Sequence, residues 1–159
     1  MDLKIYALLG AAFSMGLGAI GPAFGIGFAG CKAAQAIARQ PHAAGRITKI
    51  MLIGQAVSES PAIFALLISI FMVFNIYKMP EHVTVMHMAA FLSAGLCMGL
   101  GALGPGVGSG FANASACEGV GIQPENENLL LRTMLIGQAV SQSTSVYALV
   151  ISMCLLFVV

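Results

Sequence analysis

Long apolar stretches alternate with short polar breaks along this 159-residue chain. The pattern predicts four helices, at about 3–38, 47–77, 84–119 and 129–158. Each stretch exceeds the roughly 20 apolar residues that a helix needs to cross the hydrocarbon core of a bilayer. The composition is 58% hydrophobic and 8% charged, with a mean hydropathy of +0.93. We therefore expect an all-α membrane protein with four transmembrane helices.

An internal repeat organises these helices into two tandem hairpins. Residues 11–76 align with residues 94–159 at a constant offset of 83 without a gap, and roughly 29 of the 66 pairs are identical. One eight-residue segment begins at Met51 and returns unchanged at Met134. Two hairpins are expected, residues 1–79 and residues 80–159.

The charged residues lie near the predicted helix ends and indicate an orientation. Five basic residues flank the two hairpin loops, and two flank the other side: Lys32, Arg39, Arg46, Lys49 and Arg132 against Lys4 and Lys78. The positive-inside rule then predicts cytoplasmic loops and external termini, in a prokaryotic cytoplasmic membrane. The net charge of +1 includes no clustered basic face, so a nucleic-acid partner is not expected.

Glycines fill the first and third predicted helices: Gly16, Gly18, Gly21, Gly25, Gly27 and Gly30, then Gly99, Gly101, Gly104, Gly108 and Gly110. In lipid, small residues allow helix backbones to approach closely. Because these glycines lie on more than one face, we expect neighbours on both flanks, as in a closed ring of helices. The four cysteines form no C-x-x-C pair, so we expect packing residues rather than a disulfide, a zinc site or a cofactor site.

Glu59 is the one acidic residue centred in an apolar helix. A charge at that depth costs at least about 2.5–3.5 kcal/mol, so such a residue suggests a function. Gln55, Ser60 and the Val57 carbonyl offer oxygen atoms nearby, and Pro61 cannot donate a hydrogen bond to that carbonyl. The arrangement suits a proton or a small hard cation.

Three segments together resemble a known family: the helix at Gly16–Gly30, the loop at Arg39, Gln40 and Pro41, and the segment Gly54–Ser60. They resemble the rotor-ring proteolipid, or c-subunit, of rotary ATP synthases and ATPases, in its duplicated V-type-like form. The resemblance implies a ring of this chain, alone or mixed with other proteolipids, in membrane lipid. It implies a non-catalytic subunit in which Glu59 carries H⁺ or Na⁺ past the a-subunit of the stator. The loop would face the central stalk.

The resemblance leaves the ion open. Ile26, and Ser109 in the second repeat, stand where sodium-type members carry a glutamine, which favours a proton. Ser60 resembles a sodium-site hydroxyl and favours sodium, whose ligands would then be Glu59, Ser60 and the Val57 carbonyl.

The second repeat would supply further groups to the site. A gate tyrosine often follows the carboxylate by five residues, but Phe64 stands there, and a tyrosine occurs only in the second repeat. The contributors expected from a neighbouring hairpin are Ser143, Val140, Ser109 and Tyr147.

Gln142 occupies the position of Glu59 in the second repeat. It keeps the shape and hydrogen-bonding groups of glutamate but cannot titrate, so one ion site per two hairpins is predicted. Fewer ions per turn would favour ATP-driven pumping. Two other functions are compatible with a duplicated chain: a small transporter or channel with Glu59 as a relay, and an assembly proteolipid without transport. Transporter repeats are usually inverted, whereas these two run in the same direction.

Overall fold

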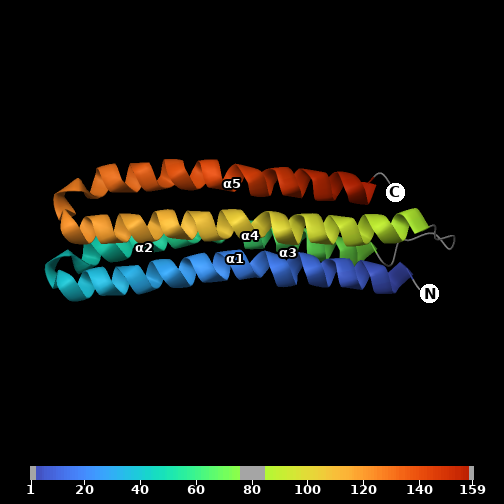
Figure 1. Ribbon diagram of the computed structural model, residues 1–159, viewed down its shortest axis with the longest axis horizontal. Coiled ribbons are helices and arrows are strands. Elements are labelled where there is room, and N and C mark those ends of the chain that lie inside the picture. The colour runs from blue at the N-terminus through green and yellow to red at the C-terminus, as the bar shows by residue number, and fades with distance from the viewer. Residues whose placement is uncertain (1–2, 76–84, 158–159) are drawn as a thin grey trace.

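The computed structural model describes residues 3–75 and 85–157, which form an all-α structure of two helical hairpins (Figure 1). The elements are α1 (Leu3–Arg39), η1 (Pro41–Ala43), α2 (Ala44–Ser58), α3 (Ser60–Asn75), α4 (Val85–Ile122), η3 (Pro124–Asn126) and α5 (Glu127–Phe157). Both hairpin turns lie at one end of the molecule (Figure 1). Four spans are long and apolar enough to cross a membrane, of 34 to 38 residues each. The chain is therefore an integral membrane protein.

The two hairpin turns have the same backbone conformation, as the repeat predicts. Gln40 has φ −134° and ψ 79°, and Gln123 has φ −134° and ψ 82°. A proline follows each glutamine and opens a short 3₁₀ turn that leads directly into the next helix. Because the fixed φ of proline suits the first position of a helical turn, the loops are shorter than the sequence pattern predicts. The expected hairpin boundary between residues 79 and 80 lies outside the described residues.

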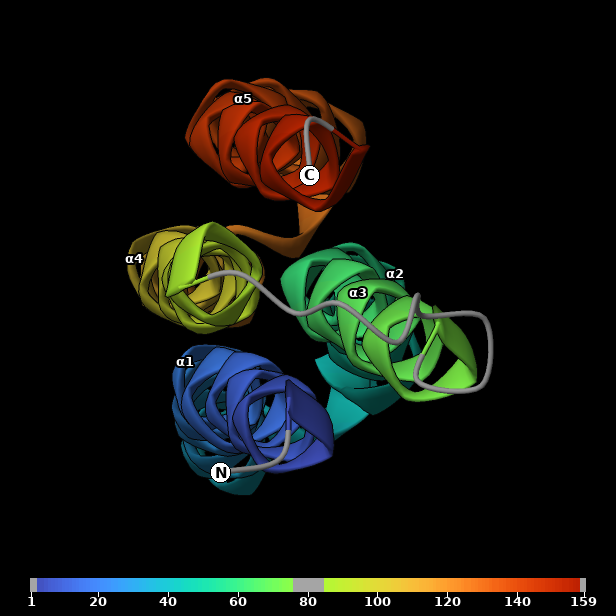
Figure 2. The same cartoon turned by 90° about the vertical axis from the view of Figure 1, so that its right-hand side faces the viewer.

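The helices form two layers (Figure 2). In one layer α1 lies against α4, and this is the most extensive contact between helices in the described part of the chain. In the other layer α2 and α3 pack against both α1 and α4, while α5 packs against α4, α3 and α2. The second span of the first hairpin, formed by α2 and α3, therefore packs against the first helix of each hairpin.

Glycines permit the close approach of α1 and α4. A Cβ atom added at Gly25 would overlap the Gly106 carbonyl oxygen, and one at Gly110 would overlap the Gly25 backbone. Larger side chains at these positions would separate the two backbones. This is the van der Waals packing through small residues that stabilises helix pairs in lipid.

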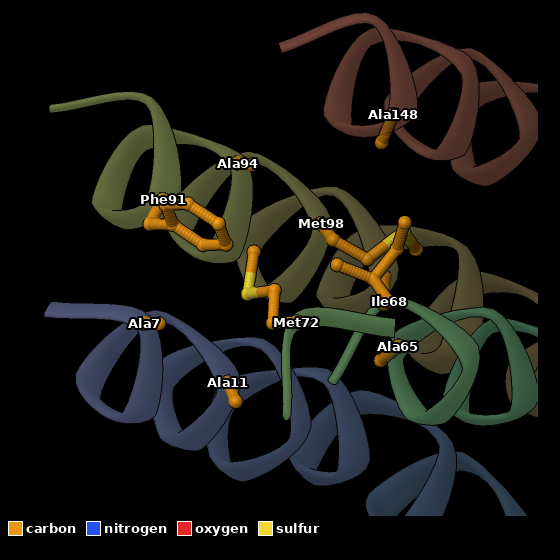
Figure 3. Packing of buried hydrophobic residues seen from close by; sticks show 10 residues of the cluster. Ala7, Ala11, Ala65, Ile68, Met72, Phe91, Ala94, Met98 and Ala148 are labelled. Carbon is orange, nitrogen blue, oxygen red and sulfur yellow. The ribbon is translucent and has the colours of Figure 1, made fainter. Parts of the chain in front are cut away.

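Two apolar clusters fill the space between the layers. One contains Met72, Phe91 and Met98 and lies toward the chain termini (Figure 3). The other includes Ile47, Ile50, Cys117, Val120 and Met134 and lies toward the hairpin turns. The polar residues described below lie between the two clusters along the helices.

Gly25 and Gly27 provide a matched test of the contact between α1 and α4. We expect Gly25→Ala to lower the stability of the detergent-solubilised single chain by about 1–3 kcal/mol, because the added methyl group meets backbone. Gly27→Ala should not, since a Cβ there meets no atom within 4 Å. Thermal unfolding followed by circular dichroism measures both, and equal losses would contradict the proposed packing.

Candidate ion-binding site

Glu59 lies at a break in the second transmembrane span. The sequence pattern predicted one helix over residues 47–77, but α2 ends at Ser58 and α3 begins at Ser60. Pro61 has no N–H to donate to the Val57 carbonyl, so the regular ladder is interrupted there. In the second hairpin Thr144 occupies the position of Pro61, and α5 runs without interruption.

The Glu59 side chain is exposed on the surface of the single chain. It lies 18 residues from the start of the span at Pro41 and 16 from its end at Asn75, about 27 and 24 Å at 1.5 Å per residue. Glu59 therefore lies near the middle of this apolar span. Within residues 3–75 and 85–157, no hydrogen bond or ion pair of this side chain is found. A lone carboxylate at this depth needs a proton or a bound cation to become neutral.

The other expected ligands lie near Glu59 along the chain, but the Gln55 amide and the Val57 carbonyl have other partners in the single chain. The Gln55 amide nitrogen donates to the Ile26 carbonyl on α1 at 3.2 Å. Ser60 and Val57 are both half-buried. The structure thus keeps these residues within about one helical turn of Glu59, without a closed ligand shell around its carboxylate.

Gln142 forms a polar contact between the two hairpins, whereas no such contact of Glu59 is found among the described residues. Its amide nitrogen donates to the Val57 carbonyl at 3.1 Å and to the Ser109 hydroxyl at 3.3 Å. The Val57 carbonyl is the oxygen that Pro61 leaves without its helical donor. Ser109 was expected to contribute to the site of Glu59, whereas in the single chain it contacts Gln142.

Gln138 and Asn113 strengthen this interface and were not identified from the sequence. The fully buried Gln138 amide nitrogen lies within 3.2 Å of three oxygen atoms, the Gly54 and Ser109 carbonyls and the Ser58 hydroxyl. The Asn113 amide donates to the Met51 carbonyl at 3.1 Å. Gln138 could have been identified, because it is the repeat counterpart of Gln55.

The remaining residues expected from a neighbouring hairpin lie on the open side of α5. Val140 is 70% exposed and Tyr147 is 65% exposed. The Ser143 hydroxyl donates to the Val140 carbonyl in its own helix at 2.8 Å. These three residues are available to a second molecule.

The hairpin turns carry ion pairs that connect the two repeats. Lys49 pairs with Glu127 at 2.8 Å, and Arg46 donates to the Pro124 carbonyl at 2.9 Å. Further from the turns, Lys32 on α1 pairs with Glu118 on α4 at 2.8 Å. Arg39 and Pro41 are exposed at the first turn, and Gln40 is half-buried. Partly exposed pairs such as these contribute little stability, but they fix the register of the two turns.

The described residues define a membrane proteolipid of two tandem hairpins, with the Glu59 carboxylate near the middle of one apolar span. The family model that describes the C-subunit of ATP synthase matches residues 9–72 and again residues 92–155. The chain belongs to this ATP synthase C-subunit family and carries its domain twice. It is thus an ion-translocating subunit of the rotor of an ATP synthase.

Individual relatives match about half of this chain. The ATP synthase c-subunit of Alkaliphilus oremlandii is 51% identical over 69 residues, which cover 43% of this chain and 77% of the relative. The ATP synthase c-subunit of Dehalococcoides mccartyi is 50% identical over 74 residues, 46% of this chain and 97% of the relative. The chloroplastic ATP synthase c-subunit of Emiliania huxleyi is 45% identical over 69 residues, 43% of this chain and 84% of the relative. Each of these relatives thus resembles part of a chain that contains the family domain twice.

Replacing Pro61 by the residue of the second repeat tests the cause of the helix break. In Pro61→Thr an N–H becomes available to the Val57 carbonyl, so we expect α2 and α3 to join into one helix, as α5 does. The amide protons of Ala62 and Ile63 should then exchange more slowly than in the parent chain in hydrogen–deuterium exchange. As the control, Thr144→Ser retains its N–H and should leave exchange in α5 unchanged. A persistent break in Pro61→Thr would mean that tertiary contacts, not the proline, interrupt the helix.

Proposed function

We propose that this chain assembles into a closed rotor ring and that Glu59 binds and releases the transported ion. The observation that supports this most directly is the Glu59 carboxylate near the middle of an apolar span, which is exposed on the single chain and has no partner among the described residues. A permanently charged carboxylate facing lipid would be costly. Reversible neutralisation by an ion allows the side chain to pass through lipid and to release the ion where water and the stator meet it.

We expect two neighbouring copies of this chain to pack through a contact that corresponds to the one between Gln142 and Val57 within one chain. The offset of 83 relates Gln142 to Glu59 and Val57 to Val140. When successive copies pack as the two hairpins of one chain do, Glu59 of one copy meets the Val140 carbonyl of the preceding copy. Ser143, three residues further along α5, is the hydroxyl expected beside it. Tyr147, the counterpart of Phe64, then lies on the same side. The ion site is thus proposed to form between two copies.

Glycines with open surroundings support the same assembly. Gly16, Gly27 and Gly104 meet no atom within 4 Å of an added Cβ. Their repeat counterparts are Gly99, Gly110 and Gly21, and each of these lies against the backbone of the other hairpin. The open glycines therefore have the packing role of their counterparts, toward the next copy rather than within the chain.

We favour the proton as the transported ion. Ile26 stands at the Ser109 position and provides no hydroxyl or amide toward Glu59, whereas a sodium ion needs several oxygen ligands. Ser60 is the residue that favours sodium, with Glu59 and the Val57 carbonyl as further ligands. A proton requires only the carboxyl group and one acceptor.

One carboxylate in two hairpins sets the ratio of ions to ATP. A ring of this chain alone carries half as many ions per turn as a ring with the same number of helices and one carboxylate per hairpin. More free energy from ATP is then available for each ion, which favours pumping over synthesis. We propose cytoplasmic turns, where Arg39, Gln40 and Pro41 contact the central stalk, and a stator a-subunit beside Glu59 in the membrane.

Chemical labelling tests the role of Glu59. A hydrophobic carbodiimide should modify Glu59 in the membrane-embedded protein, because the protonated carboxyl reacts with this reagent. Mass spectrometry of peptides locates the label, and sodium that slows labelling at neutral pH would identify Na⁺ as the ion. Glu59→Gln should reduce ATP-driven ion transport of the complex to background, because the site can no longer bind and release a charge.

The paired carboxylate of Glu118 provides the control for this experiment. Glu118→Gln loses the ion pair with Lys32 but retains the mid-membrane carboxylate, so transport should remain. Unlabelled Glu59, or unchanged pumping by Glu59→Gln, would refute the assignment.

Cross-linking tests the ring. Within one chain a Cβ at Gly21 would overlap the Leu103 carbonyl oxygen, and the offset of 83 converts this contact into Gly104 against Ile20 of the next copy. We expect Ile20→Cys combined with Gly104→Cys, in a chain with its four cysteines changed to alanine, to form a ladder of oligomers on oxidation.

Each single cysteine variant is the control for the ladder. One cysteine per chain can join at most two chains, so gel electrophoresis should show no species above a dimer. The absence of species above a dimer in the double variant would contradict head-to-tail packing of the copies.

A further inference from the structure

The interface between the two hairpins of one chain contains a polar site that differs from the site of Glu59. The Gln142 amide nitrogen lies between two oxygen atoms from different hairpins, the Val57 carbonyl and the Ser109 hydroxyl. The Ser145 hydroxyl donates to the Gln142 backbone carbonyl at 2.7 Å and lies 3.4 Å from the Gln142 amide oxygen. The partial positive charge of the amide therefore faces the two oxygens, and the amide oxygen lies beside a hydroxyl group.

The Val57 carbonyl oxygen and the Ser109 hydroxyl oxygen both face the Gln142 amide nitrogen, so they could act as two ligands of a cation at that position. A carboxylate at position 142 could not replace the amide, because the Val57 carbonyl can only accept hydrogen bonds. The carboxylate and this carbonyl would repel each other unless a cation or a proton lay between them. In the chain as it is, the amide nitrogen meets both oxygens without an added ion.

Gln138 extends this contact by one helical turn. Its side-chain amide reaches the Gly54 carbonyl and the Ser58 hydroxyl of the first hairpin, and the side chain is fully buried. Gln55, its repeat counterpart, bonds to Ile26 of its own hairpin. In the single chain, two glutamines one turn apart therefore join the hairpins on the side of Gln142.

We propose that the Gln142 amide is a fixed substitute for a cation and keeps the interface between the two hairpins of one chain closed. The interface at Glu59, by contrast, binds and releases an ion in each cycle. Only this contrast depends on the function proposed above; the role of Gln142 is a property of the single chain. Because all contacts of Gln142 come from one chain, the test needs no assembled ring.

The test compares the full-length Glu59→Gln chain with the double variant Glu59→Gln, Gln142→Glu, both purified in detergent at pH 8. We expect the melting temperature of the double variant to fall by about 4 °C or more in choline chloride, since two hydrogen bonds are lost. Sodium or lithium chloride at the same ionic strength should restore it, and should slow carbodiimide labelling of residue 142 at least tenfold. The Glu59→Gln parent should respond to neither salt.

Two results would overturn the proposal. One is a double variant that melts like its parent in choline chloride even at a pH raised until carbodiimide no longer labels residue 142, because a proton on that carboxyl could otherwise take the place of the cation. The other is labelling of residue 142 that no alkali cation slows. The Glu59→Gln background removes the native carboxylate, so failure here is distinct from failure of the labelling experiment on Glu59.

If the Glu59→Gln, Gln142→Glu double variant does not accumulate, a second pair of variants tests the role of Gln142. Gln142→Leu removes the two bonds to Val57 and Ser109. The matched control, Asn75→Leu, removes an amide that donates to the Phe71 carbonyl in its own helix at 3.2 Å. We expect Gln142→Leu to melt at least 4 °C below Asn75→Leu and to show faster amide exchange in α2 and α5. Equal melting temperatures would overturn the proposal.

Discussion

The close contact between α1 and α4 is the constraint on which the rest of the structure depends. In lipid, burial of apolar side chains does not draw helices together, so the two backbones must approach closely enough for dispersion forces to act. Gly25 and Gly110 permit this, since a Cβ at either position would overlap the opposite backbone. The remaining helices then form a second layer, and this arrangement brings the mid-membrane polar residues of the two hairpins together.

Glu59 and Gln142 show how one repeat position acquires two properties. In one chain the glutamine faces the other hairpin and bonds to the Val57 carbonyl, while the carboxylate faces outward. Pro61 affects both residues. It interrupts the helix at Glu59, and it leaves the Val57 carbonyl available to Gln142. The duplicated chain thus has a polar contact between its hairpins at Gln142 and an exposed carboxylate at Glu59. A single-hairpin protein has no interface within the chain at which to make this distinction.

Much of this fold follows from sequence patterns alone. Hydropathy predicts four spans, and the offset of 83 residues predicts two like hairpins with equivalent turns. The hydropathy pattern predicted wrong helix boundaries where a proline changes the backbone hydrogen bonding locally. Pro41 and Pro124 shortened the loops, and Pro61 divided the second span at Glu59. Hydropathy averages over many residues and therefore cannot locate a single missing N–H, although the proline itself is visible in the sequence.

By itself, the sequence determined that the chain is a duplicated membrane proteolipid with one acidic residue centred in an apolar stretch, because these properties depend on composition, length and order. Only the tertiary structure decided the partners of the polar side chains. Ser109 accepts a hydrogen bond from Gln142, and the roles of Gln138 and Asn113 were not foreseen. These contacts join residues 29 to 85 positions apart. The packing of the two hairpins determines such pairs, and no spacing along the chain specifies that packing.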